Sequence, residues 1–145
     1  MSGGKVLAAV LLCVSITGAT LLYAAETPAL TQALNAIRTA TTEAVTQTDA
    51  LRTEIARVRT LDDALGIVNR FYAIVSRLND EINAVEKEFS GRVETRRLST
   101  GMEEFKRRAE TSGNSFGASL GTLPPDILEA SEFVAALQKI KNLVD

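Results

Sequence analysis

The chain has 145 residues, a formal net charge of −2, no histidine, no tryptophan and only 5% aromatic residues. The absence of histidine removes the commonest general base and the commonest metal ligand, and the balanced charge gives no basic surface of the kind that binds nucleic acid. Composition therefore argues against an enzyme, a metal or cofactor site, a small-molecule substrate and a nucleic-acid partner.

Residues 6–25 form an uncharged run without proline. A helix rises about 1.5 Å per residue, so this run spans roughly 30 Å, the hydrocarbon thickness of a bilayer. We predict a single transmembrane helix within residues 1–25, with Lys5 in a short N-terminus that stays in the cytoplasm. The residues expected in the span include Val6, Leu12, Cys13, Ser15, Ala19, Leu22 and Tyr23.

The same run also fits a secretory signal peptide that is cleaved off. Residues 6–16 form an apolar core, and Thr17, Gly18 and Ala19 supply the small side chains that a signal peptidase reads. A second site, after Ala25, is poorer because Tyr23 places a bulky ring where a small side chain is needed. A retained signal-anchor is favoured, because the apolar stretch resumes and ends near Tyr23, an aromatic residue of the kind that settles at the membrane interface. Both interpretations place the rest of the chain on the extracytoplasmic side, in the periplasm or its equivalent.

Residues 26–111 carry the spacing of long amphipathic helices. Over 29–58, an apolar residue or threonine recurs at alternating four- and three-residue intervals, which is a coiled-coil pattern. Threonine is an indifferent helix former, so this helix is expected to need a partner helix. The pattern restarts after Thr60, and Asp63 adds negative charge to a new first turn. We predict a turn near 59–60, with one long helix containing a register slip as the alternative.

The second amphipathic pattern runs to Phe89 and then thins. Residues 86–110 are mostly charged, which predicts a well-solvated helix. A modest basic cluster in this region, offset by glutamates, consists of Arg92, Arg96, Arg97, Lys106, Arg107 and Arg108. A solvated face is the favoured interpretation of this cluster, and contact with an acidic partner or with lipid headgroups is the alternative.

Residues 112–123 are rich in glycine and serine and predict a linker. The string Gly113-Asn114-Ser115-Phe116-Gly117 matches Gly-x-Ser-x-Gly, but a nucleophile elbow also needs a preceding strand and a histidine. Pro124 and Pro125 then open a last amphipathic helix over 124–145. Its apolar stripe would lie in a groove of its own chain or of another subunit.

Taken together, these patterns predict an all-α protein: one N-terminal transmembrane helix, then extended or folded-back, coiled-coil-like extracytoplasmic helices. We expect a non-enzymatic accessory subunit of a larger membrane complex, whose partners are other membrane-protein subunits, a second copy of itself, or both, together with the lipid bilayer. The alternative is an exported helical binding protein, such as a periplasmic adaptor or chaperone, with a cleaved signal peptide. The expected contact residues are Leu34, Ile37, Leu51, Ile55, Val58, Ile127, Val134, Leu137 and Val144.

Overall fold

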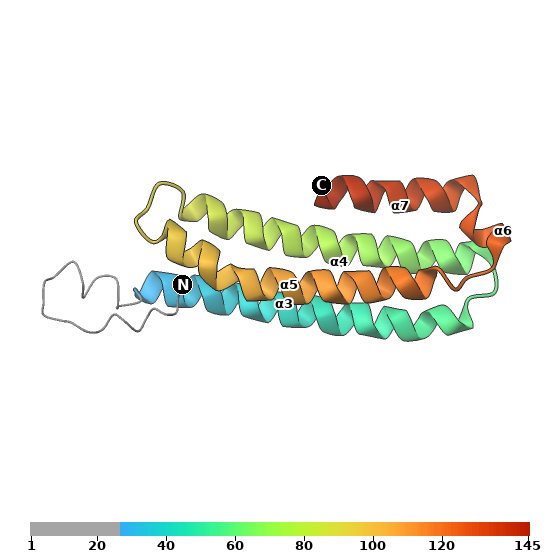
Figure 1. Cartoon of the computed structure of the whole chain (residues 1–145), viewed down its shortest axis with the longest axis horizontal. Coiled ribbons are helices and arrows are strands. Elements are labelled where there is room, and N and C mark those ends of the chain that lie inside the picture. The colour runs from blue at the N-terminus through green and yellow to red at the C-terminus, as the bar shows by residue number, and fades with distance from the viewer. Residues whose placement is uncertain (1–26) are drawn as a thin grey trace, which may run out of the picture.

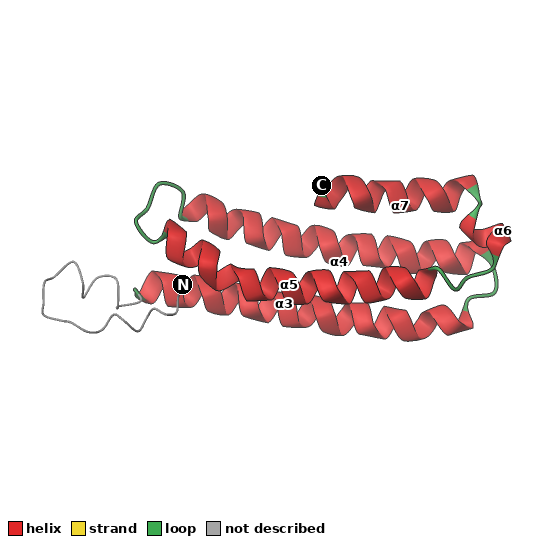
Figure 2. Cartoon of the chain, in the orientation of Figure 1, coloured by secondary structure: helices red, strands yellow, loops and turns green. Residues whose placement is uncertain are grey.

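The computed structural model describes residues 27–145, and no strand occurs among them. Three long helices lie side by side: α3 (Pro28–Glu54), α4 (Leu61–Glu88) and α5 (Thr95–Leu120) (Figures 1 and 2). A 3-10 turn, η1 (Ile55–Arg57), follows α3, and the chain ends with α6 (Pro125–Leu128) and α7 (Ser131–Val144). The all-α prediction is confirmed, and these helices fold back on one another instead of extending.

Helices α3 and α5 run parallel, and α4 runs antiparallel to both (Figure 1). Thr27 Oγ1 donates to Glu94 Oε2 at 3.1 Å, across 67 residues. Further along the same pair, Arg108 donates to Thr42 Oγ1 at 3.3 Å, across 66 residues. This nearly constant separation is what a parallel pair in register produces. Helix α7 packs on α4 and runs parallel to it.

All five phenylalanines of the chain are buried, in two apolar clusters. The near cluster, at the end where α3 begins, contains Leu30, Ala33, Ile37, Phe89, Leu98, Met102 and Phe105. The far cluster contains Leu51, Ile55, Val58, Ala64, Ile67, Val68, Phe71, Phe116, Leu120, Leu123, Ile127 and Phe133. Between the two clusters, the bundle buries the small polar residues Thr41, Thr48 and Ser112.

The chain turns between α3 and α4 at the place where the sequence predicts a turn. Thr60 Oγ1 accepts from the Asp63 backbone N–H at 3.1 Å, and Asp63 Oδ2 accepts from the Thr60 N–H at 3.2 Å. This reciprocal capping box satisfies backbone donors that the first turn of a helix leaves unpaired. The Arg59 N–H also donates to Asp63, and these donors lower the pKa of the Asp63 carboxyl below its usual value.

The predicted solvated helix over 86–110 is interrupted by a turn at residues 89–94. Gly91 has φ of 78° there, a left-handed conformation that residues with a Cβ rarely adopt. Phe89, the first residue of the turn, and Leu98, which follows it, are both buried in the near cluster. This region therefore contributes two large apolar side chains to the core, although most of its residues are charged.

The predicted linker at 112–123 is wrong for most of its length, because α5 continues to Leu120. Phe116 and Leu120 lie in the far cluster, and the Phe116 ring stacks on Phe71 with centroids 4.2 Å apart. Each glycine in a helix interior costs about 1 kcal/mol relative to alanine. Burial of two large apolar side chains outweighs that cost.

The predicted single helix over 124–145 is two helices, broken at Glu129 and Ala130. Ile127 and Phe133 are six residues apart, so an unbroken helix would point them about 120° apart. Ala130 has an extended backbone, and after this break both side chains enter the far cluster.

Residues 1–26 lie outside the described part of the chain. The predicted transmembrane residues Val6, Leu12, Cys13, Ser15, Ala19, Leu22 and Tyr23 therefore have no structural counterpart to compare. Within residues 27–145, no helix has the length and apolar character that crossing a bilayer requires.

Replacing Thr60 with alanine removes the capping oxygen of α4. We expect the free energy of unfolding of the full chain to fall by about 1 kcal/mol, measured by urea denaturation followed by circular dichroism. Thr53→Ala is the control, because the exposed Thr53 hydroxyl donates to the Ala50 carbonyl within α3 and caps no helix start. Equal effects of the two substitutions would show that the cap contributes nothing.

The lowered pKa of Asp63 also predicts how the stability of the protein depends on pH. Its folded-state pKa is depressed, so its contribution to stability is present above the unfolded-state pKa and is lost as the pH falls through the folded-state pKa. We expect wild type to lose stability more steeply on acidification than Asp63→Asn, in urea titrations at a series of pH values. A slope unchanged in Asp63→Asn would contradict the prediction.

Candidate helix-binding groove

A groove of about 460 Å³ lies between α3 and α4. It begins at Gln32, about one turn into α3, and follows that helix to Gln47. Helix α3 lines it with Gln32, Asn35, Ala36, Thr39, Ala40, Glu43, Ala44 and Gln47, and α4 with Ile74, Arg77, Leu78 and Glu81.

The groove exists because α3 presents its smallest side chains to α4 here. Ala36, Ala40 and Ala44 recur every four residues and so share one face of the helix. Packed helices stay roughly 8–10 Å apart, a distance that single methyl groups do not fill. Opposite the alanines, Leu78 is buried and Ile74 is half-buried. The result is an apolar floor, with exposed glutamine, asparagine and threonine side chains along the α3 rim.

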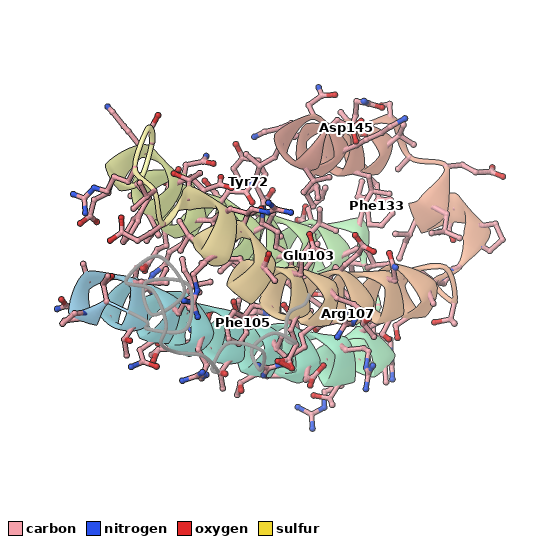
Figure 3. All side chains as sticks on the ribbon, turned by 60° about the vertical axis from the view of Figure 1, so that its left-hand side comes forward. Tyr72, Glu103, Phe105, Arg107, Phe133 and Asp145 are labelled. Atoms are coloured by element: carbon pink, nitrogen blue, oxygen red, sulfur yellow. The ribbon has the colours of Figure 1, made fainter. Side chains whose placement is uncertain are left out.

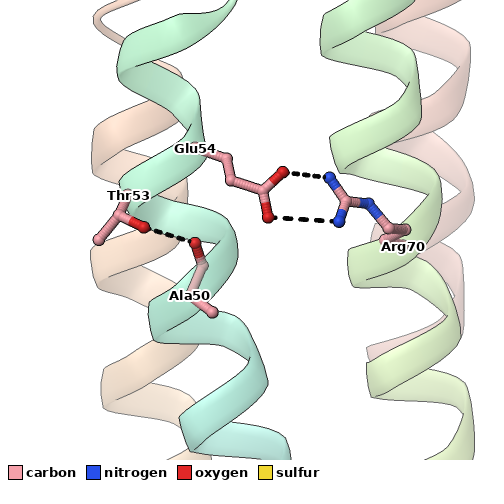
Figure 4. A network of polar contacts seen from close by, with 4 residues as sticks. All are labelled: Ala50, Thr53, Glu54 and Arg70. Atoms are coloured by element: carbon pink, nitrogen blue, oxygen red, sulfur yellow. Dashed lines mark hydrogen bonds and ion pairs between the residues drawn. The ribbon is translucent and has the colours of Figure 1, made fainter.

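Two ion pairs tie α3 to α4 along this side of the bundle. Arg77 Nη1 lies 3.3 Å from Glu43 Oε1 at the rim of the groove. Towards the far cluster, Arg70 donates through both terminal nitrogens to Glu54, at 2.5 and 3.3 Å (Figure 4). The Arg70 hydrogen bonds lower the pKa of Glu54, and Glu54 raises the pKa of Arg70. Both pairs are exposed, so they orient the helices more than they stabilise them.

The rim of the groove is slightly acidic. Its charged residues are Glu43, Glu81 and Arg77, and Arg77 is paired with Glu43. The second carboxylate, on Glu81, has no ion-pair partner among the described residues within 4.0 Å. A segment that lies in the groove would therefore match it best with an apolar face flanked by basic side chains.

Most of the predicted contact residues pack inside the chain itself. Ile37 lies in the near cluster, and the far cluster contains Leu51, Ile55, Val58 and Ile127. Leu34 and Leu137 are half-buried against these clusters. Val134 and Val144 are 51% and 59% exposed. The partner that the threonine-containing α3 pattern needs is supplied by α4 and α5.

Two features of the structure are not among those predicted from the sequence. The first is the alanine stripe of the groove, for which the four-residue spacing of Ala36, Ala40 and Ala44 was the available signal. The second is Phe133, which is fully buried and joins α7 to the bundle (Figure 3). Near it, the Lys139 ammonium lies 5.0 Å from the centre of the Tyr72 ring. Phe133 and this cation–π contact thus join half-buried Leu137 and Ile140 in docking α7 on the bundle.

No cluster of three potential metal-ligating side chains occurs within residues 27–145. A comparison of the chain with protein-family models finds no matching family. Searches of curated proteins and of solved structures find no match either. The geometry of the described residues is therefore the basis for a functional proposal.

Thr41, in the stretch of α3 that lines the groove, turns into the bundle and is 1% exposed. Its hydroxyl has no hydrogen-bond partner. An unpaired buried hydroxyl is unfavourable by about 1–3 kcal/mol. We therefore expect Thr41→Val, which keeps the shape and removes the hydroxyl, to raise the free energy of unfolding by about 1 kcal/mol.

The matched control for this substitution is Thr46→Val, because Thr46 is exposed on the same helix. Both variants have the same change in helix propensity, so urea denaturation isolates the effect of burial. A destabilised Thr41→Val variant would contradict the prediction and show that the hydroxyl is bonded in solution.

Proposed function

We propose that this protein is a non-enzymatic, single-pass membrane subunit that binds a helix of a neighbouring subunit in the groove between α3 and α4. The observation that carries the proposal is the apolar floor of Ala40, Ala44 and Leu78 between polar rims. An apolar floor with polar rims is how helix-binding grooves hold an amphipathic helix.

The dimensions of the groove support a helix as its occupant. The α3 wall from Gln32 to Gln47 covers about four helical turns, roughly 22 Å. Alanine methyl groups let a second backbone approach closely. A partner helix would contact the floor with residues at four-residue spacing and the rim with its polar flanks. The acidic excess of the rim favours basic residues on those flanks.

The position of the groove supports a membrane neighbour as the source of that helix. The predicted transmembrane segment ends at residue 25, and α3 begins at Pro28. The groove starts within about one turn of that point, at Gln32. A helix that leaves the bilayer beside the anchor would reach the groove without a long connecting segment.

The test is site-specific photo-crosslinking of the full chain in its native membrane. A crosslinking side chain at position 40 should capture a helical segment of another membrane subunit, identified by mapping the joined peptides. The same group at position 50, which is exposed on α3 outside the groove, is the control. Ala36→Leu should fill the groove and reduce the crosslinking yield at position 40 about tenfold, which corresponds to a loss of about 1.4 kcal/mol of binding free energy.

The matched variant Ala50→Leu should leave the yield at position 40 unchanged. Equal capture at positions 40 and 50 would contradict occupancy of the groove. Capture of a second copy of this chain would contradict a different subunit as the occupant.

The second candidate function is an exported helical binding protein with a cleaved signal peptide. It is supported by the two apolar clusters that residues 27–145 form with one another. The intact mass of the mature protein separates the two. A mass near 15.6 kDa, the value for the whole chain, supports the anchored subunit. A mass lower by residues 1–19 or 1–25 supports the exported protein.

A further inference from the structure

We infer that the turn between α4 and α5 is a second membrane contact, in which an exposed valine and its neighbouring arginines rest on anionic lipid headgroups. This inference rests on the proposed membrane-anchored function. We call the proposed lipid-facing surface the tip, and it consists of residues 89–97.

The tip lies at the same end of the bundle as the start of α3 (Figure 1). The antiparallel course of α4 returns the chain to this end, and the hydrogen bond from Thr27 Oγ1 to Glu94 Oε2 joins the tip to the first described residue. Thr27 follows the predicted transmembrane segment, which ends at residue 25, by two positions. An anchor in the bilayer would therefore hold the tip close to the lipid surface.

The side chains of the tip suit that surface. Val93 is 96% exposed, more than any other large apolar side chain among residues 27–145. Arg92 and Arg96, both exposed, lie on either side of Val93 in the sequence, and Glu94 is the one carboxylate within residues 89–97. An exposed apolar side chain beside basic groups is the combination that anionic membrane surfaces attract.

Several contacts within the tip brace this turn. Phe89 is fully buried beneath it, and the Arg92 guanidinium lies 4.9 Å from the centre of the Phe89 ring. Thr95 Oγ1 donates to the Arg92 carbonyl at 2.7 Å, and Gly91 provides the left-handed residue of the turn. Little conformational freedom is then lost when the tip meets a surface.

Two other members of the basic cluster contact neighbouring helices. Lys106 forms an ion pair with Glu86 at 3.3 Å, and Arg108 donates to Thr42 on α3. At the opposite end of the bundle, Arg59 donates to the Val58 carbonyl, and the side chains of Val58 and Leu123 are buried. The combination of an exposed apolar side chain with neighbouring arginines thus distinguishes the tip from the other end of the described bundle.

The chain has no tryptophan, so a single introduced tryptophan reports on one position. We would reconstitute full-length Val93→Trp into phosphatidylglycerol-containing vesicles and into phosphatidylcholine vesicles, and measure quenching by a quencher attached to the lipid. Val134→Trp is the matched control, because Val134 is also exposed but lies in the first turn of α7, towards the far cluster. We expect quenching and a blue-shifted emission for Val93→Trp in phosphatidylglycerol vesicles, and neither for Val134→Trp.

Charge is tested by adding Arg92→Gln and Arg96→Gln to Val93→Trp. An arginine near an anionic surface strengthens binding about fivefold, so the double change should greatly weaken quenching in phosphatidylglycerol vesicles. Salt should have the same effect, because it screens charges over roughly 10 Å at 0.1 M.

Flotation of the vesicles separates the two ways of failing. Protein that does not float with the vesicles would overturn the anchored function and this inference together. Protein that floats, with Val93→Trp quenched no more than Val134→Trp, would overturn this inference alone. Quenching at position 93 that is equal in the two lipids and unaffected by the arginine changes would overturn the role of charge.

Discussion

Burial of five phenylalanine rings at the two ends of the bundle is the constraint on which the rest of the structure depends. With no tryptophan and few other aromatic residues, these rings supply the largest apolar surfaces in either cluster. Truncating one such ring to alanine typically costs 3–5 kcal/mol, a large part of a total stability of about 5–15 kcal/mol. On α3, the stretch between the clusters is left to small residues, including Thr41 and Ala44, which face Leu78 of α4 or the bundle interior. The groove extends into that stretch, and the buried Thr41 hydroxyl there goes unpaired.

Much of the helical pattern could be predicted because local chemistry determines it. The apolar spacing identified the buried face of α3, and Thr60 with Asp63 identified the start of α4. The apolar spacing of a helix shows which of its faces is buried, but not which neighbouring helix covers that face. The parallel pairing of α3 with α5 therefore could not be predicted. Composition misled at residues 112–120, because glycine and serine outnumber the two residues, Phe116 and Leu120, whose burial keeps that segment helical. The break before α7 likewise depends on a tertiary contact, the burial of Phe133.

The groove could not be predicted for a related reason. Three alanines on one helix face are compatible with tight packing, with solvent exposure or with a cavity. Which of these occurs depends on the position of α4, and the ion pairs of Glu43 with Arg77 and of Glu54 with Arg70 hold α4 across from the alanines. The predicted contact residues were drawn from the most apolar positions, and these are the positions that a folded-back chain buries in its own core. The groove proposed here for a partner helix is lined on α3 by small side chains instead.

The pairing of α3 with α5 across 67 residues has a consequence for biosynthesis. A ribosome adds about 5–20 residues per second, so roughly 3–13 s separate the synthesis of paired positions on the two helices. During this interval α3 and α4 can form a hairpin, but Leu34 lacks the close contact with Gly101 that completes its packing. The hairpin then exposes an apolar flank that the finished protein conceals.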